Sequence, residues 1–254
     1  MPLDLPWPIT LAVFVAGALL LSFGPYAILR RVFTVEEETE RLAGSVLFRI
    51  GGLHALILAL VFADAQVSLV GLRDGVATEA TALTDVYYDL ARYGTTPADE
   101  ARTDVVVYTR AVIEDEWPRL AERRLSGEAW AAWQALYDVA LDLTPETPRQ
   151  AYLRGQILDR IQAIAEYREQ RRFGAARSLS GLFWSVAVIG FFLVALPYFV
   201  FRPTPAHLFL MTAFAVFNGL VMFIILATNH PFTAPVTVDP TPFEVLLSTD
   251  MARN

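Results

Sequence analysis

The chain contains no cysteine, no lysine and only three histidines. Without cysteine there is no disulfide, no thiolate metal site and no cysteine nucleophile. The histidines, His54, His207 and His230, are scattered along the chain, so no zinc site, haem site or other cofactor is expected. No segment matches a phosphate-binding loop, a nucleophile elbow or a paired-carboxylate site, which disfavours an enzyme.

All 20 basic residues are arginine. The net charge is −7. No basic stripe stands free of neighbouring carboxylates. Proteins that bind nucleic acids present such a stripe to the phosphate backbone. The charge pattern therefore argues against a nucleic-acid partner.

Apolar residues, in contrast, are abundant and clustered. They make up 55% of the 254 residues, and the mean hydropathy is +0.42, which is too apolar for an ordinary soluble domain. Residues 5–29 contain no charge, and a helix of that length exceeds the roughly 30 Å hydrocarbon core of a bilayer. Residues 178–201 and 207–228 are two further predicted spans.

The second span is less regular than the others. Only 14 uncharged residues lie between Arg49 and Asp64, which would also suit a buried helix of a soluble protein. Placing Asp64 inside a membrane span costs about 3 kcal/mol on insertion scales, and the apolar residues around it can offset this cost. We therefore predict an amphipathic span over residues 46–72.

Residues 73–177 have the composition of a soluble domain, and no strand pattern competes with helix there. We expect helices over 76–93, from 96 to about 124, from 126 to about 143, and onward from a capping box at Thr147 and Gln150. Prolines break the tail, and Thr241 caps a short last helix.

The predicted fold class is therefore all-α: an integral membrane protein with about four transmembrane helices and a helical soluble domain between the second and third. The predicted divisions are a first transmembrane pair at 1–72, the soluble domain at 73–177, a second pair at 178–229 and a tail at 230–254. The positive-inside rule divides evenly and leaves the orientation open.

One face of the second span combines small and apolar side chains with charge at its edges. On a helical wheel it holds Arg49, Gly52, Leu56, Ala59, Leu60, Ala63, Asp64 and Val67. Such a face could line a water-filled path, with Leu56 and Leu60 one turn apart as a dewetting constriction. Tight helix packing through small residues is the alternative. The opposite face, with His54 and Leu58, suits lipid or a neighbouring helix.

Asp64 is the sharpest single signal in the membrane segments. An ionisable group inside a span faces a cavity or a partner. The alternative is that the span ends early and that Asp64 sits among lipid headgroups.

Two charged runs lie outside the spans. Arg168, Arg171 and Arg172 precede the third span, where they either line an ion entrance or form a solvated face. The run 114–116 is expected to be solvated, with Trp117 packed into the helical bundle.

Several motifs, taken in order, resemble the bacterial bestrophin-like family of membrane proteins, and the resemblance covers nearly the whole chain. The motifs are Glu79-Ala80 and Ala82-Leu83 after the second span; Tyr108 ahead of Asp115-Glu116-Trp117-Pro118; Arg168 with Arg171-Arg172 before the third span and its Trp184; Pro231-Phe232 after the fourth span; and Val238-Asp239-Pro240-Thr241-Pro242-Phe243.

The resemblance implies four spans in the cell inner membrane, a cytosolic helical domain and a ring-shaped oligomer, a pentamer, around the second span. Bestrophins are anion channels with an apolar neck on that span, and by position Leu56 and Leu60 fall at the neck, with Gly52 one turn earlier. This chain departs from the pattern in its aliphatic neck and in Ala59, where glycine is usual. Asp64 would favour cations if it faced a pore.

Two functions are therefore expected. The first is an oligomeric ion channel lined by the second span, with the bilayer, small inorganic ions and further copies of the chain as partners and with the ion sign open. The second is a non-conducting membrane sensor or scaffold whose helical domain binds a ligand or a partner protein.

Overall fold

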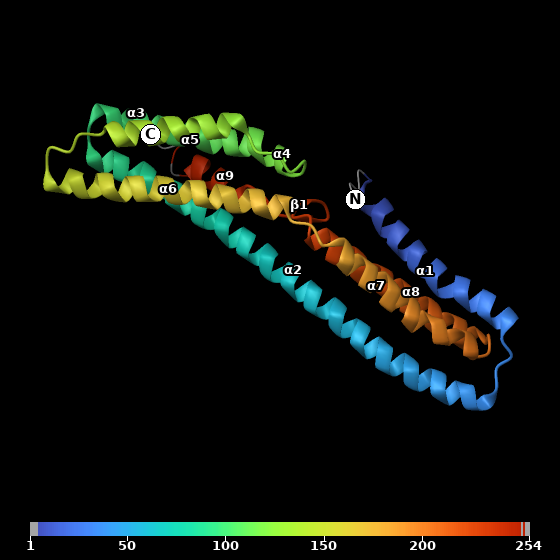
Figure 1. The fold of residues 1–254 in the computed structure, drawn as a ribbon. Helices are drawn as coiled ribbons and strands as arrows, with labels where there is room; N and C mark the ends of the chain where they lie inside the picture. Colours follow the sequence, from blue (N-terminus) through green and yellow to red (C-terminus); the bar gives the residue numbers. More distant parts are fainter. Residues whose placement is uncertain (1–4, 250, 252–254) are drawn as a thin grey trace. The chain divides into compact units, whose positions relative to one another are not determined.

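The computed structural model describes residues 5–249 and residue 251, so the outermost parts of the predicted segments 1–72 and 230–254 lie outside the described residues. Nearly all of its regular structure is helical (Figure 1). The chain divides into two compact units. Unit 1 comprises Met1–Val67 and Ser178–Asn229, and unit 2 comprises Ser68–Arg177 and His230–Asn254.

Four helices among the described residues are long and apolar enough to cross a membrane, in agreement with the predicted four spans. They are α1 (Trp7–Val32), α2 (Glu37–Tyr93), α7 (Gly181–Ala195) continued by the 3₁₀ turn η2 (Leu196–Val200), and α8 (Pro205–Thr228). Their most apolar 18-residue windows are only 11–39% buried. Such exposed apolar surface is compatible with lipid or with further protein, not with water.

Unit 1 is held together by close helix packing. Leu58 of α2 packs with Ala187 of α7 and Met222 of α8, and Phe191 stacks on Phe214 with ring centroids 5.6 Å apart. Glycine makes one close approach possible, because a Cβ on Gly219 would lie 2.9 Å from the Val15 Cα of α1. Small residues bring membrane helices together in this way.

Helix α2 is one uninterrupted helix (Figure 1), which corrects the prediction of a span ending near residue 72 and a separate helix over 76–93. Arg73 and Asp74 end the apolar run, but charge does not end a helix, and no proline follows to break it. Gly75 is tolerated inside the helix because it gives room to α6: a Cβ there would lie 3.3 Å from Gln170 Oε1.

Unit 2 is a helical bundle. Besides the end of α2 it contains α3 (Thr96–Ala111), the π-helical turn η1 (Val112–Glu116), α4 (Trp117–Leu120), α5 (Gly127–Asp142) and α6 (Pro148–Ala176). A hairpin of β1 (Phe232–Thr233) and β2 (Val236–Thr237), paired Phe232 to Thr237, leads to α9 (Thr241–Thr249). The hairpin was not expected from the sequence, whereas the short last helix is confirmed.

The predicted helix from 96 to about 124 is confirmed as far as Leu120, but it contains a π-helical turn that was not predicted. Pro118 has no N–H to donate to the carbonyl four residues earlier, and its ring crowds that turn. The chain widens into the π turn η1 just before this proline, and the α4 helix ends at Leu120. The predicted capping box is confirmed: Gln150 N donates to Thr147 Oγ1 at 3.2 Å, and Thr147 N donates to Gln150 Oε1 at 3.1 Å.

The core of unit 2 gathers residues from every one of its helices except α4. Leu83, Val105, Leu136, Ile161 and Phe243 are each fully buried, and they come from α2, α3, α5, α6 and α9. The C-terminal helix α9 is therefore part of the core of unit 2.

Candidate functional site

The residues predicted to line a pore lie on an uncovered face of α2. All six, Gly52, Leu56, Ala59, Leu60, Ala63 and Asp64, are exposed. Leu56 and Leu60 are 56% and 63% exposed, and Val67 beyond them is 73% exposed. Since successive turns of a helix repeat every 3.6 residues, these positions form one stripe along α2.

The opposite face of α2 packs within unit 1. Leu58 and Ala65 are 5% and 2% exposed. His54 is 5% exposed and lies against α7, where a Cβ on Gly190 would come 2.5 Å from His54 Nδ1. This face was predicted to contact lipid or a neighbouring helix, and in the structure His54 and Leu58 contact neighbouring helices.

The geometry limits what the exposed stripe can do in one chain. Leu56 and Leu60 are one turn apart, about 6 Å along the helix axis. Because both side chains are largely exposed, they can narrow a path only when further chains bring their own α2 helices alongside. Within one chain, the stripe is an uncovered apolar surface.

A second group of functional candidates lies in unit 2, where four charged side chains form a buried network. Arg171 Nη1 pairs with Glu79 Oε2, and Arg171 Nη2 pairs with Glu116 Oε1 at 2.7 Å. Arg168 Nη2 lies 2.6 Å from Glu116 Oε2. The side chains are 1% exposed for Arg171, 8% for Arg168 and 0% for both glutamates. Two carboxylates and two guanidinium groups make the network neutral.

Neutral groups complete the network. The Tyr108 hydroxyl donates to Glu79 Oε1 at 2.8 Å, and Ser126 N donates to Glu116 Oε2 at 3.2 Å. Ser126 also begins α5, since Ala129 N donates to its Oγ at 3.0 Å. Buried charges are tolerated only when they are paired and hydrogen-bonded in this way.

Aromatic rings enclose the guanidinium groups. Arg171 lies 5.5 Å from the ring centroids of both Trp117 and Phe243, and Arg168 lies 5.4 Å from that of Trp130. Trp117 Nε1 donates to the Val238 carbonyl at 3.0 Å, which ties the C-terminal tail to the network.

The surroundings shift the pKa values of three members, Glu79, Tyr108 and Arg171. Burial raises the pKa of Glu79, and the neighbouring Arg171 guanidinium opposes that rise. Burial raises the pKa of Tyr108 well above its usual value, and the Glu79 carboxylate raises it further. Burial alone would lower the pKa of Arg171, but Glu79, Tyr108 and Glu116 outweigh it and hold that pKa above the usual value. Arg171 therefore keeps its charge and Tyr108 keeps its proton.

The network corrects part of the sequence analysis. A solvated face is wrong for Glu116, Arg168 and Arg171, which are buried, whereas the packing of Trp117 into the bundle is confirmed. Arg172 is 49% exposed and pairs with Glu169 on the same helix. The ion entrance assigned to the three arginines stays a prediction.

A signal for the two buried arginines was present in the sequence. The apolar seam of α6 runs Ile157, Ile161 and Ile164 at steps of four and three residues. The next two steps of four and three reach Arg168 and Arg171, so both arginines continue the seam into the core. Glu79 likewise follows Val76 by three residues on the buried face of α2.

Residues from most of the motifs named above as bestrophin-like meet in this network. Glu79, Tyr108, Glu116, Arg168 and Arg171 are its polar members, and Trp117 and Phe243 enclose it. The network thus connects segments that are far apart in the chain. Its four charged side chains are paired with one another inside the core of unit 2.

Comparison with known proteins agrees with this motif order. The sequence profile of the Bestrophin-like domain matches residues 12–243, which includes most of α1, the other three spanning helices and the whole network. No curated protein and no solved structure matches the chain. With four helices fit to span a bilayer and a family match over most of its length, this chain is a membrane protein that belongs to the bestrophin-like family.

Proposed function

We propose that the chain forms an oligomeric ion channel whose pore is lined by Gly52, Leu56, Ala59, Leu60, Ala63 and Asp64 of α2. One observation carries the proposal. This stripe is exposed along its length in the single chain, while the opposite face of α2 packs on α7 and α8. An apolar stripe interrupted by a carboxylate suits a pore better than it suits lipid on all sides.

The neck of the pore is formed by Leu56 and Leu60. Rings of leucine from several copies exclude water when they come close enough, and they gate by dewetting. Gly52 before the neck and Ala63 after it are small, so the path is wider on both sides of the neck. The family resemblance supports a pentamer.

The ion sign depends on two opposing contributions. The resemblance supports anions. A ring of Asp64 carboxylates next to the neck would instead attract cations and repel anions. We take anions as the conducted species and regard Asp64 as a residue that lowers their entry.

The same resemblance supports the placement of the chain in the cell. We propose a multi-pass protein of a bacterial inner membrane, with the transmembrane pairs at 1–72 and 178–229 and with residues 73–177 as a cytoplasmic helical domain. The tail 230–254 lies on that side as well, and its α9 packs in the core of unit 2.

Single-channel recording in planar bilayers tests the channel. We expect the Leu56→Ala, Leu60→Ala double variant to carry larger or longer openings than the wild-type protein, because alanine widens and wets the neck. The matched control is Leu20→Ala, Leu210→Ala, since these leucines of α1 and α8 are 73% and 63% exposed and stand outside the stripe. The control should conduct like the wild type.

The opposite result is equally informative. Silence from the wild type and from the double variant, with folded oligomers confirmed in the same preparation, would overturn the proposal. It would support a non-conducting sensor or scaffold whose helical domain binds a ligand or a partner protein. A stable monomer in detergent would also overturn it, because one α2 cannot enclose a path.

A further inference from the structure

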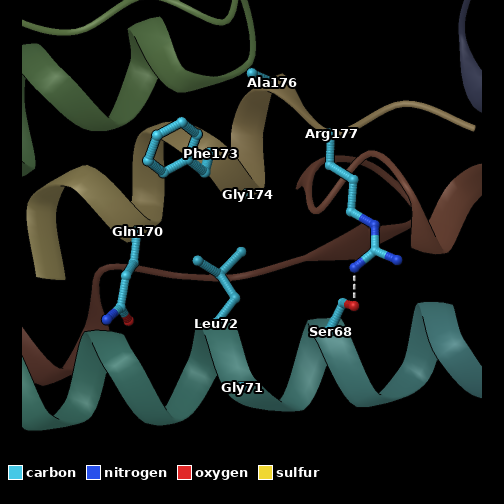
Figure 2. A pocket seen from close by; sticks show the side chains of 8 residues that line it. All are labelled: Ser68, Gly71, Leu72, Gln170, Phe173, Gly174, Ala176 and Arg177. Carbon is cyan, nitrogen blue, oxygen red and sulfur yellow. Dashed lines mark hydrogen bonds between the residues drawn. The ribbon is translucent and has the colours of Figure 1, made fainter.

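A groove in unit 2 has an apolar wall between two polar ends, one of which is formed by the Gln170 side chain. Its cavity volume is about 460 Å³, and it lies between α2 and the end of α6 (Figure 2). Ser68 and Arg177 form the other polar end, where Arg177 Nη1 donates to Ser68 Oγ. The wall consists mainly of Leu72, Phe173, Gly174 and Ala176.

The polar end formed by Ser68 and Arg177 carries the groups that bind a phosphate. A guanidinium presents its N–H donors as a planar fork that matches two phosphate oxygens, and a serine hydroxyl adds a further donor. Figure 2 shows the Arg177 side chain reaching from the end of α6 toward Ser68 on α2, so both groups border the same space.

The wall beside this pair is apolar and shaped by small residues. Gly174 leaves room for Leu72, because a Cβ there would lie 3.0 Å from Leu72 Cδ1. Gly71 also borders the groove and has nothing within 4 Å of where a Cβ would be. The Phe173 side chain at the rim is 62% exposed, which is a large apolar area to leave open.

The groove stands next to two membrane-spanning segments in the chain. Arg177 comes four residues before Gly181, the first residue of α7. Four residues reach at most about 14 Å, so Arg177 cannot lie far from the start of that span. Ser68 belongs to α2, whose apolar part is also a candidate span. Basic pockets at the ends of membrane helices bind the headgroups of acidic lipids.

We propose that this groove binds an anionic phospholipid, with its phosphodiester on Arg177 and Ser68 and the first carbons of an acyl chain along Leu72 and Phe173. The charge of Arg177 selects an acidic headgroup, and the apolar wall selects a lipid over a free phosphate. The inference does not depend on conduction, because a lipid can bind whether or not the oligomer forms a pore.

Native mass spectrometry of the purified full-length protein tests the site, with phosphatidylglycerol and phosphatidylcholine added at equal concentration. We expect wild-type protein to retain phosphatidylglycerol preferentially. Arg177→Gln should weaken that binding about tenfold, which is the size expected for one charge-assisted hydrogen bond. Gly71→Leu should weaken it to a similar degree, because the new side chain occupies the groove.

Matched variants on α6 control for charge and for the loss of a glycine. Arg149→Gln removes an exposed arginine, and Gly155→Leu fills open space away from the groove. Both should bind phosphatidylglycerol like the wild type. Should Arg177→Gln fail to fold, Gly71→Leu still decides the matter, because it meets no neighbour and removes a helix-weakening glycine.

Three results would overturn the proposal. Equal retention of the two lipids would show that charge is not recognised. Unchanged phosphatidylglycerol binding by folded Arg177→Gln and Gly71→Leu would place the lipid elsewhere. Displacement of the lipid by inorganic phosphate at millimolar concentration would identify a site for a soluble anion. No displacement is expected, because inorganic phosphate gains nothing from the apolar wall.

Discussion

Arg171 and Glu79 stand 92 positions apart in the chain and form an ion pair whose side chains are 1% and 0% exposed. The pair joins α6 to α2 inside unit 2, and Arg171 reaches on to Glu116 of η1. Taking such charges out of water is costly, so each one depends on the presence of the others. Removing one member therefore tests how much the buried network stabilises the protein.

Replacing Arg171 with methionine should destabilise the protein strongly. The substitution leaves Glu79 buried without its cation, and breaking a buried pair from one side costs about 3–5 kcal/mol. Thermal unfolding in detergent, followed by tryptophan fluorescence, measures the change. Arg172→Met is the control, because its pair with Glu169 is exposed to solvent, and an exposed pair adds little to stability. Equal unfolding midpoints for the two variants would show that the buried network does not stabilise the protein.

Tyr108 should make the free energy of unfolding fall as the pH rises into the alkaline range. Its pKa is raised in the folded protein, mainly by burial, so folding favours the protonated hydroxyl. That contribution is complete below the ordinary tyrosine pKa of about 10 and is lost as pH rises toward the folded value. The stability advantage of wild type over Tyr108→Phe should thus shrink above about pH 10.

Unfolding midpoints between pH 8 and pH 11 measure this advantage. Tyr152→Phe is the control, since the Tyr152 side chain is 68% exposed. Its stability should follow the wild type at every pH. A constant difference between wild type and Tyr108→Phe across the range would show that Tyr108 does not couple its proton to folding.

Gly219→Ala should weaken unit 1. The new Cβ would lie 2.9 Å from Val15 Cα, and a backbone atom cannot rotate away as a side chain can. Overpacking of this kind costs about 1–3 kcal/mol. Gly17→Ala on α1 is the matched control, because it meets nothing within 4 Å and should be neutral or slightly stabilising. If both variants unfold at the wild-type temperature, α1 and α8 do not approach as closely as the structure has them.

Asp64→Asn should change ion selection if the channel proposal holds. Removing the carboxylate ring removes a repulsion of anions, so the reversal potential in a salt gradient should move toward the anion equilibrium value. Asp142→Asn makes the same change of charge on the exposed end of α5 and should leave the reversal potential as it is. An unmoved potential for Asp64→Asn would remove Asp64 from the pore lining.

The membrane character of the chain was predictable residue by residue. Uncharged runs of about 20 residues leave few alternatives to a span, and the two faces of α2 follow from helical period alone. The exposed stripe with Leu56 and Leu60 and the buried face with Leu58 agree with that wheel. The pattern of apolar residues does not identify what covers the exposed stripe, because it carries no information about groups outside the chain.

The buried network was the part that local reasoning missed. Glu116 stands in an acidic run and Arg171 in a basic one, and each run by itself is typical of a solvated surface. The sequence showed that charged residues continue the apolar seams of α2 and α6. It did not show which opposite charges would pair with them. Pairing across 55 positions between Glu116 and Arg171 depends on how the helices are arranged.

By itself, the sequence determined most of the helical segments, the four spans, the capping of α6 and the family, because these depend on composition, local spacing and motif order. Only the tertiary structure decided that α2 continues unbroken through the charged residues after its apolar stretch and that four charges meet inside unit 2. The physical reason is that burying a charge is unfavourable for each residue taken singly. It becomes favourable only when folding brings the partner charges and hydrogen bonds to the same place.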